Sequence, residues 1–482
     1  MTSKRISLQW RRTKIIATLG PATDDAASIK SMIKEGVNVF RLNMSHGTHE
    51  QHRATFNRVR KIAAEMHAHV AILMDLCGPK IRAGKFKDGE ITLRNNSSVI
   101  ISCNNVIGED GLIPSRYTSL YKDVAKGERI LLADGNLELR VTKVSGKDIH
   151  CKVIFGGTLK DNKGINLPDT KVSVSSFTAK DKADVALAME LGADFLALSF
   201  VRTAKDVTSL QNFMKRNGEP IPVIAKIEKS EAVANIDEIL KVAYGIMIAR
   251  GDLGIELPAE QVPLIQKTLI TRARHRDKPV IVATQMLESM VRNSRPTRAE
   301  VGDVANAALL GTDAVMLSEE TAIGKYPLRA IRVMNSILRE IEARQWEQEL
   351  FASDNVAKVI GKSLRTREAV SHAVTSLARD LKLQGIIVPT RSGITAIILA
   401  ANRPSAPLIG VSTSEKVCRM MALHWGIVPV QAEEQETHDW KSLSLSLSRE
   451  CKLTRSGNTV LLVSGFSEIS ELNEPVLKII KV

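Results

Sequence analysis

Short apolar runs rich in β-branched residues recur through the first two thirds of the chain, and amphipathic stretches separate most of them. Runs of this length predict strands, and the stretches between them, such as 23–35, 203–217 and 263–276, have the apolar spacing of helices. Strand–helix units in alternation predict an α/β protein with a (β/α)8 TIM barrel. The predicted strands are residues 14–18, 38–42, 70–75, 194–199, 222–228, 245–250, 279–284 and 313–318.

The alternation is interrupted after the third predicted strand, where residues 80–175 intervene before the helical stretch 178–191. Within this segment, runs such as 98–102 and 138–144 alternate apolar with polar residues, and Asp134 with Gly135 has the composition of a tight turn. We predict that 80–175 form an inserted β-barrel lid domain, hinged on a catalytic barrel made of 1–79 and 176–345.

The pattern changes again at about residue 346. A predicted helix at 367–383 precedes strands and helices at 385–388, 393–402, 407–411, 415–423, 458–464 and 475–481. The serine–leucine alternation at 442–448 is expected to lie on a helix face. We predict a C-terminal open α/β domain at 346–482.

The composition is that of a folded, soluble protein, because 44% of the 482 residues are hydrophobic and 25% are charged. No apolar run is long enough to span a membrane, and the basic N-terminus lacks the apolar core of a signal peptide. We therefore expect a cytoplasmic protein with no membrane contact. The five cysteines include no CxxC pair, which argues against a disulfide framework or a zinc finger.

The net charge of +14 fits a polyanionic partner, whether nucleic acid, acidic lipid or a phosphorylated metabolite. The basic residues are scattered along the chain, and no RNA-binding signature, zinc-finger spacing or basic helix is present. Nucleic acid is therefore the minor alternative, and we expect no nucleic-acid partner.

Polar residues follow the predicted strands at the end where the loops of a (β/α)8 barrel form its active site. In the fifth strand, the two-residue period places Lys226 and Glu228 on one face, so both charged side chains point into the barrel mouth. A buried structural ion pair is the alternative. The other candidates at strand ends are Asn43, Ser45, Asp75, Asp252, Thr284, Ser318 and Glu320.

The carboxylates of Glu228 and Asp252, on neighbouring strand ends, suit Mg²⁺, which takes its remaining ligands from water and substrate oxygens. Residues 250–254 (RGDLG) have the composition of a glycine-flanked turn, whose N–H groups could hold a carboxylate or a phosphate. A lysine, a divalent cation and backbone donors together favour phosphoryl transfer.

Two other motifs leave alternatives open. His46, His49 and His52 recur every three residues, but this spacing drifts around a helix and no HExxH is present, so zinc binding is the weaker interpretation. No P-loop or Rossmann glycine pattern is found. The turn at 390–395 (TRSGIT) could hold a phosphate at a helix N-terminus or simply cap that helix.

Taken together, these residues resemble the pyruvate kinase family, and the resemblance runs over nearly the whole chain. So many matches in one order are highly specific. The matching segments are residues 14–22 (KIIATLGPA), 40–47 (FRLNMSHG), 75–82 (DLCGPKIR), 225–228 (AKIE), 249–256 (ARGDLGIE), 283–290 (ATQMLESM), 296–301 (PTRAEV) and 316–322 (MLSEETA).

The resemblance implies a barrel with a β lid and an effector domain, assembled as a homotetramer, that moves phosphate from phosphoenolpyruvate to ADP. Glu228 and Asp252 would bind Mg²⁺, which Mn²⁺ can replace, and Lys226 would neutralise the phosphoryl group during transfer. The substrate carboxylate would be held by the backbone of the loop after the sixth strand and by one hydroxyl, at Ala249, Arg250, Gly251, Asp252 and Thr284.

The same resemblance implies a proton relay and a nucleotide site. Thr284 would protonate the enolate through water and hydroxyl groups, with Ser318 and Glu320 in the relay. Arg41 would contact both the transferred group and the nucleotide. The residues that would bind the nucleotide are Arg41, Asn43, His46, Arg82 and, from the lid, Lys163.

Many pyruvate kinases require potassium, in a pocket that Asn43, Ser45 and Asp75 would form here. Members that depend on the cation tend to carry glutamate at the position of Lys80, and a lysine resembles the potassium-independent kind. An ammonium group there would supply the charge that the ion otherwise brings, so we expect no potassium requirement. The alternative is that Lys80 points outward at the lid hinge.

The C-terminal domain is expected to bind a sugar or nucleotide monophosphate as an activator. Bisphosphate-activated members carry extra Trp- and Arg-containing loops, whereas residues 465–470 (GFSEIS) continue into Glu471 and Glu474. The effector residues would be Thr390, Arg391, Ser392, Gly393 and Thr395.

Two positions depart from the family pattern. Cys77 stands where a longer polar residue is usual, and Glu319 stands where a small one is usual, which could alter the proton relay. Two alternatives to pyruvate kinase stay open: another phosphoenolpyruvate-handling or aldolase-type barrel, and a non-catalytic nucleic-acid-binding protein.

Overall fold

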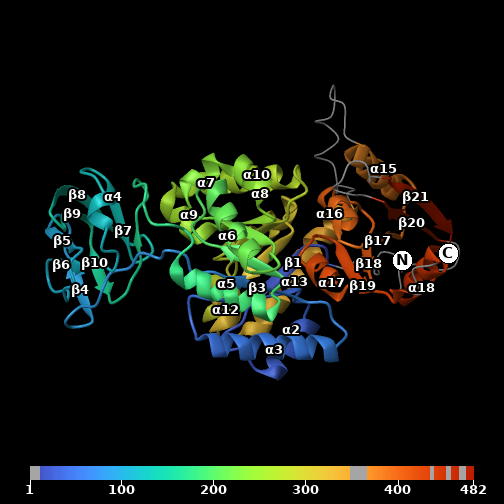
Figure 1. The fold of residues 1–482 in the computed structure, drawn as a ribbon, viewed down its shortest axis with the longest axis horizontal. Coiled ribbons are helices and arrows are strands. Elements are labelled where there is room, and N and C mark those ends of the chain that lie inside the picture. Colours follow the sequence, from blue (N-terminus) through green and yellow to red (C-terminus); the bar gives the residue numbers. More distant parts are fainter. Residues whose placement is uncertain (1–10, 348–365, 435–438, 452–457, 466–473, 482) are drawn as a thin grey trace.

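The computed structural model describes residues 11–347, 366–434, 439–451, 458–465 and 474–481. A β-rich unit lies at one end of the molecule, a barrel in the middle and an α/β unit at the other end (Figure 1). Most of the segment used above to predict the effector type, residues 466–473, lies outside the described residues.

Eight parallel strands close the central barrel, in the order β1-β16-β15-β14-β13-β12-β3-β2. All eight predicted strands are therefore confirmed. They are β1 (Lys14–Thr18), β2 (Val39–Asn43), β3 (Ala71–Asp75), β12 (Phe195–Leu198), β13 (Val223–Ile227), β14 (Gly245–Ala249), β15 (Val280–Ala283) and β16 (Ala314–Leu317).

The two-residue period of β13 has the predicted effect. Ile224 packs inside the barrel with Met247 of β14. Val223 and Ala225 instead join the larger apolar cluster between the strands and the surrounding helices. Lys226 therefore shares the inward face with Ile224 and lies closer to the carboxyl end of the strand.

Helices cover the outside of the barrel, and side-chain caps fix several of their starts. Thr297 Oγ1 accepts a bond of 3.2 Å from the Glu300 N–H, and Glu300 Oε2 accepts one of 2.7 Å from the Thr297 N–H, so the two residues form a capping box. The helices are α2 (Ala26–Lys34), α3 (His49–Glu65), α5 (Ala179–Leu191), α6 (Ala204–Asn217), α7 (Ser230–Ala234), α8 (Ile236–Val242), α9 (Arg250–Glu256), η1 (Ala259–Gln261), α10 (Val262–Arg274), η2 (Glu288–Val291), α11 (Arg298–Leu309), α12 (Glu319–Ala322) and α13 (Pro327–Glu347).

The segment between β3 and α5 forms the β-rich unit, called the lid below. It contains a six-stranded sheet in the order β11-β7-β8-β9-β5-β6 and a two-stranded sheet, β10-β4. Its own apolar core includes Ile101, Leu132 and Leu139. Its elements are β4 (Glu90–Leu93), β5 (Ser98–Ser102), β6 (Leu112–Pro114), α4 (Leu120–Asp123), β7 (Arg129–Leu132), β8 (Leu137–Ser145), β9 (Asp148–Phe155), β10 (Gly157–Lys160) and β11 (Ile165–Asn166).

The C-terminal unit is an open sheet in the order β19-β18-β17-β20-β21, in which β21 runs antiparallel to β20. The predicted helix over the serine–leucine alternation is confirmed as α18. The edge strand β19 was not predicted, because Pro429 interrupts its apolar run and proline favours edge positions. The elements are α15 (Thr366–Asp380), β17 (Gly385–Pro389), α16 (Ile394–Ala401), β18 (Leu408–Ser412), α17 (Glu415–Met421), β19 (Ile427–Gln431), α18 (Trp440–Glu450), β20 (Thr459–Ser464) and β21 (Val476–Lys481).

The C-terminal unit closes the base of the barrel. Leu423, just after α17, packs against the inward-facing residues of the barrel strands. Arg403 forms a buried ion pair of 3.0 Å with Asp313, and Arg419 forms one of 2.9 Å with Asp194. Apolar packing and ion pairs therefore both join the two units.

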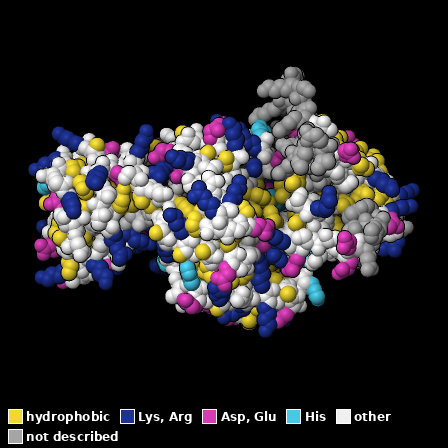
Figure 2. All heavy atoms as spheres, viewed as in Figure 1, with side chains coloured by type: hydrophobic (Ala, Val, Ile, Leu, Met, Phe, Trp, Pro, Cys, Tyr) yellow, Lys and Arg dark blue, Asp and Glu magenta, His cyan; other side chains and the backbone are white. Residues whose placement is uncertain are grey.

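Lys and Arg side chains are spread over the visible face of all three parts of the molecule (Figure 2). This face therefore shows no single basic surface of the kind that binds nucleic acid. Among the described residues, none of the helices combines the length and the apolar character that crossing a membrane requires.

Candidate active site

A pocket of about 130 Å³ opens at the carboxyl ends of the barrel strands. The structure brings twelve of the predicted site residues together there. They are Arg41, Asn43, Ser45, His46, Asp75, Lys80, Arg82, Lys226, Glu228, Ala249, Asp252 and Thr284.

Lys226 lies among acidic and hydroxyl groups on the floor of this pocket. Its Nζ lies 2.9 Å from Glu228 Oε1 and 3.3 Å from Asp75 Oδ1, and it donates a bond of 2.7 Å to Ser199 Oγ. Burial lowers the pKa of Lys226, but the charges of Asp75 and Glu228 outweigh burial, so the pKa is raised. The ammonium group therefore keeps its charge at neutral pH while it lines an open pocket.

Asp75 lies between two basic side chains of the pocket, Lys226 and Arg41. Its Oδ2 accepts a bond of 2.7 Å from Arg41 Nε, and Arg41 Nη1 donates one of 3.1 Å to Thr18 Oγ1. Burial raises the pKa of Asp75, but Lys226 and Arg41 together outweigh it and hold the pKa below its usual value. Asp75 is therefore ionised and fixes the directions of both basic side chains.

Glu228 and Asp252 are the two carboxylates that could hold a metal. Glu228 Oε2 accepts a bond of 2.7 Å from the Phe200 N–H. Burial raises the pKa of Glu228, and the charge of Asp252 raises it further against the opposing effect of Lys226. A divalent cation would relieve this repulsion, and two carboxylates fit Mg²⁺, which takes most of its ligands from water and substrate.

Three or more metal-ligating side chains converge nowhere in the part of the chain that the structure describes. The zinc alternative therefore fails on geometry, because the three histidines diverge. His49 Nε2 lies 2.8 Å from Asp184 Oδ1, and His52 Nε2 lies 2.7 Å from the carbonyl oxygen of His46. Of the three, only His46 lines the pocket.

Thr284 stands at the end of β15 in a strained backbone conformation. Its φ is 67°, in the left-handed region that costs a β-branched residue free energy. Thr284 Oγ1 accepts a bond of 2.7 Å from the Gly251 N–H and donates one of 2.6 Å to the Ala283 carbonyl. Arg250 Nη2 donates one of 2.8 Å to the Thr284 carbonyl, which helps to hold the strained residue in place.

The prediction of a turn at 250–254 was wrong, because these residues form the first part of α9. The side chain of Arg250 is not part of the pocket lining, and it pairs instead with Asp303 of α11. Arg250 and Gly251 therefore contact Thr284 and do not line the pocket themselves. Ala249 and Asp252 are the residues of this segment that line it.

Ser318 and Glu320, which follow β16, lie outside the lining of the pocket, although Met316 of β16 belongs to it. Glu320 accepts bonds of 2.7 Å from the Ser318 N–H and 3.1 Å from the Leu287 N–H. Burial raises the pKa of Glu320. Glu319, at the start of α12, is exposed, and Cys77 is a half-buried member of the pocket.

The lid contributes the side chains of Lys80 and Arg82 to the lining of the pocket. Lys163 is exposed and lies outside the pocket lining, and its carbonyl accepts a bond of 2.8 Å from the Ala83 N–H. Arg82 Nη1 donates one of 3.0 Å to the Asn162 carbonyl. Lys80 is exposed, yet it lines both this pocket and the neighbouring one.

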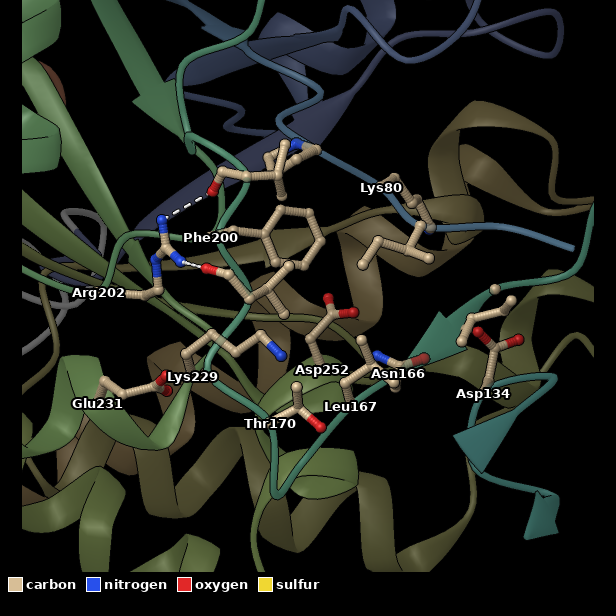
Figure 3. Close-up of a pocket in the computed structure, with 16 residues that line it drawn as sticks. Lys80, Asp134, Asn166, Leu167, Thr170, Phe200, Arg202, Lys229, Glu231 and Asp252 are labelled. Atoms are coloured by element: carbon tan, nitrogen blue, oxygen red, sulfur yellow. Dashed lines mark hydrogen bonds between the residues drawn. The ribbon is translucent and has the colours of Figure 1, made fainter. Parts of the chain in front are cut away.

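The neighbouring cavity, of about 50 Å³, lies between the lid and the barrel, and its lining includes Asp252 of the barrel and Asp134 of the lid (Figure 3). Arg202 reaches from the barrel to two backbone carbonyls of the lid connection, those of Val172 and, at 2.9 Å, Val174. The sequence reasoning missed Arg202 and Ser199. Both follow the fourth strand, where polar residues after a strand end are the available signal.

Comparisons with known proteins agree with this geometry. Residues 10–331 match the family model "Pyruvate kinase, barrel domain", and 368–480 match "Pyruvate kinase, alpha/beta domain". The chain is 43% identical over 460 residues to a pyruvate kinase of Geobacillus stearothermophilus, covering 94% of this chain and 78% of the relative. It is 41% identical over 462 residues to a pyruvate kinase of Thermococcus litoralis, covering 95% and 96%.

A solved structure gives the same result for the fold. A pyruvate kinase of Cryptosporidium parvum superposes with a TM-score of 0.91 at 35% identity, covering 98% of this chain and 97% of that one.

Proposed function

Because the chain belongs to the pyruvate kinase family, we propose specific roles for the side chains of its barrel mouth. The enzyme transfers the phosphoryl group of phosphoenolpyruvate to ADP, which yields pyruvate and ATP in the last step of glycolysis. The observation that carries the assignment of roles is the charged lysine, Lys226, on the floor of a pocket that is also lined by the carboxylates of Glu228 and Asp252.

Glu228 and Asp252 would hold Mg²⁺, or Mn²⁺ in its place. When bound, the cation would supply positive charge to the oxygens of the phosphoryl group and of the substrate. Lys226 stabilises the same oxygens from the floor of the pocket, where little water screens its charge. Asp75 positions Lys226 and Arg41 for this task, since it contacts both.

Transfer breaks the bond between phosphorus and the enol oxygen and forms a bond to a terminal oxygen of ADP. The electron pair of the broken bond stays on the enolate, which takes a proton at carbon to give pyruvate. We assign the orientation of the substrate carboxylate to the loop that contains Ala249 and Asp252, together with Thr284. Thr284 delivers the proton through its hydroxyl and water, and we place Ser318 and Glu320 in the same relay, behind the lining of the pocket.

The nucleotide phosphates bind to Arg41 and Arg82, with Asn43 and His46 beside them. These four side chains line the same pocket as Lys80. Lys163 lies outside the lining of the pocket in this structure. It joins the four side chains only when the lid closes over the bound nucleotide.

Lys80 takes the place of potassium beside Asn43, Ser45 and Asp75. The C-terminal unit binds a sugar or nucleotide monophosphate that activates the enzyme, on the turn made of Thr390, Arg391, Ser392, Gly393 and Thr395. The working enzyme is a cytoplasmic homotetramer.

The activity is tested by coupling pyruvate formation to NADH oxidation with purified lactate dehydrogenase. Turnover is expected only when phosphoenolpyruvate, ADP and Mg²⁺ are all present, and Mn²⁺ is expected to replace Mg²⁺. Turnover that persists after ADP is omitted or the metal is chelated would contradict the proposed roles. A control without the kinase measures pyruvate release by phosphatase in the coupling reagents.

A further inference from the structure

Lys229 and Glu256 form a buried ion pair beside the proposed metal ligands. Lys229 Nζ donates a bond of 2.5 Å to Glu256 Oε1, and the two side chains are only 12% and 2% exposed. Neither residue lines the catalytic pocket, so any effect of the pair on the reaction must pass through its neighbours.

Each partner of the pair belongs to a segment that carries one of the two carboxylates. Lys229 directly follows Glu228, which itself follows the end of β13. Glu256 is the last residue of α9, and Asp252 lies in the first turn of that helix. The ion pair therefore joins the two segments that present the proposed Mg²⁺ ligands.

The helix α9 depends on tertiary contacts for its position. It has seven residues, which is too short for a helix to be stable alone. At its start, the Gly251 N–H donates a bond of 2.7 Å to Thr284 Oγ1, after β15. At its other end, Glu256 accepts the bond from Lys229, after β13. Since β13 and β15 flank β14, the helix that presents Asp252 is tied to the strand ends on both sides.

Neither stability nor charge alone explains the pair. Replacing a buried ion pair by apolar side chains of similar volume is often neutral or stabilising, so a stable fold does not require these two charges. Lys229 also lines the same cavity as Asp252 (Figure 3). A lysine there would by itself repel a cation, so its charge does not serve the metal directly. What the two groups together can supply is position.

We propose that Lys229 and Glu256 are positioning residues that hold Glu228 and Asp252 at the separation a divalent cation requires. Mg²⁺ demands a nearly ideal octahedron, so small shifts of its ligands lower its affinity. Groups that contact the ligand-bearing elements commonly set metal affinity in this way. The inference rests on the proposed metal role of Glu228 and Asp252, and it gives the pair no contact with substrate.

The double variant Lys229→Met with Glu256→Met separates position from net charge and from stability. It removes one positive and one negative charge, and its thermal unfolding should stay close to that of the wild type. Mn²⁺ binding to the full-length protein without substrates, followed by electron paramagnetic resonance of the free ion, should be weaker by about tenfold or more. Lys229→Arg keeps a cation that can pair with Glu256, so it should bind Mn²⁺ within about threefold of the wild type.

A matched lysine–glutamate pair on α8 provides the control. Lys241 and Glu238 lie 2.6 Å apart and line neither the catalytic pocket nor the cavity between the lid and the barrel. Lys241→Met with Glu238→Met should leave the Mn²⁺ affinity unchanged. Equal Mn²⁺ affinity of the wild type and the double variant at 229 and 256 would overturn the proposal.

The single variant Lys229→Met decides the question by the sign of its effect, even if the double variant does not fold. Loss of a positive charge would by itself strengthen cation binding. If the pair positions the ligands, Mn²⁺ should instead bind more weakly. Equal or stronger binding would overturn the proposal.

Asp252→Asn distinguishes the role of the pair from the metal site itself. It should weaken Mn²⁺ binding because it removes one of the two carboxylates. If it does so while the double variant binds Mn²⁺ like the wild type, only the role of the pair fails. If the wild type binds no Mn²⁺, or binds it independently of Asp252, the proposed metal site and the role of the pair fail together.

Discussion

Buried charges gather at both ends of the barrel, but their surroundings differ. At the mouth, Lys226, Asp75 and Glu228 belong to one unit and face a pocket. At the base, Asp313 of the barrel accepts bonds of 3.0 Å from Arg403 and 3.1 Å from the Trp425 N–H, both in the C-terminal unit. Burial and pairing alone therefore do not identify a catalytic charge. The mouth is distinguished because its charges remain accessible to a ligand.

Lys14 at the base and Lys226 at the mouth show the same difference between the two ends of the barrel. Burial, with a smaller contribution from Arg11, lowers the pKa of Lys14 at the base to about 7, and its Nζ donates a bond of 2.6 Å to the Ile427 carbonyl. Burial acts on Lys226 as well, but Asp75 and Glu228 reverse its effect. The neighbouring carboxylates, and not the depth of burial, therefore decide which lysine keeps its charge.

The largest expected effect comes from removing the charge at the mouth. Lys226→Met should lower kcat on the order of 10³-fold, equivalent to about 4 kcal/mol, because the lost charge acts mainly on the transition state. KM for phosphoenolpyruvate should change much less. The matched variant Lys14→Met should alter thermal stability and leave kcat within about threefold. Steady-state kinetics and thermal unfolding check both, and a comparable kcat loss in Lys14→Met would remove the distinction between the two ends.

The eight strands and the direction of Lys226 could be predicted because both depend on local periodicity, which the chain displays directly. The two carboxylates and Thr284 could be placed because strand ends of a closed barrel meet at one rim. Arg250 was misplaced because its partner, Asp303, comes from a distant helix. The separation of Ser318 and Glu320 from the pocket likewise depends on backbone contacts with Leu287 that no spacing rule contains.

The second prediction tests the base. Arg403→Met keeps the side-chain stem but leaves Asp313 without its ion-pair partner, and a broken buried pair costs about 3 kcal/mol of unfolding free energy. Thermal unfolding should show the loss, whereas kcat at low temperature should be retained. The exposed pair Lys241–Glu238 provides the control, since Lys241→Met should change stability by less than about 0.5 kcal/mol. Equal effects of the two variants would show that the ion pair at the base does not join the units.

The third prediction concerns pH. His424 titrates at about 4 in the folded protein and at about 6.5 when unfolded, so the unfolded chain binds more protons between these values. The histidine therefore lowers stability as the pH falls through this window, by about 2 kcal/mol between pH 7 and pH 5. His424→Gln should flatten that part of the stability profile relative to the wild type. Parallel profiles for the two proteins would show that His424 does not titrate in this way.

The smallest effect is expected at Lys80, whose ammonium group is proposed to take the place of a monovalent cation at the mouth. With tetramethylammonium as the only monovalent cation, adding potassium should raise pyruvate formation by less than tenfold, below about 1.4 kcal/mol. Lys80→Glu should make the enzyme weak until potassium is supplied, because the pocket then loses one positive charge and gains a negative one. Lys85→Glu makes the same charge change at an exposed lid residue that lines neither pocket, and it should stay indifferent to potassium. Potassium that stimulates the wild type tenfold or more, or that fails to rescue Lys80→Glu, would exclude this role. The Lys80 ammonium group would then be an ordinary exposed charge beside the lid. The pocket at the mouth would need a monovalent cation from solution to supply the positive charge.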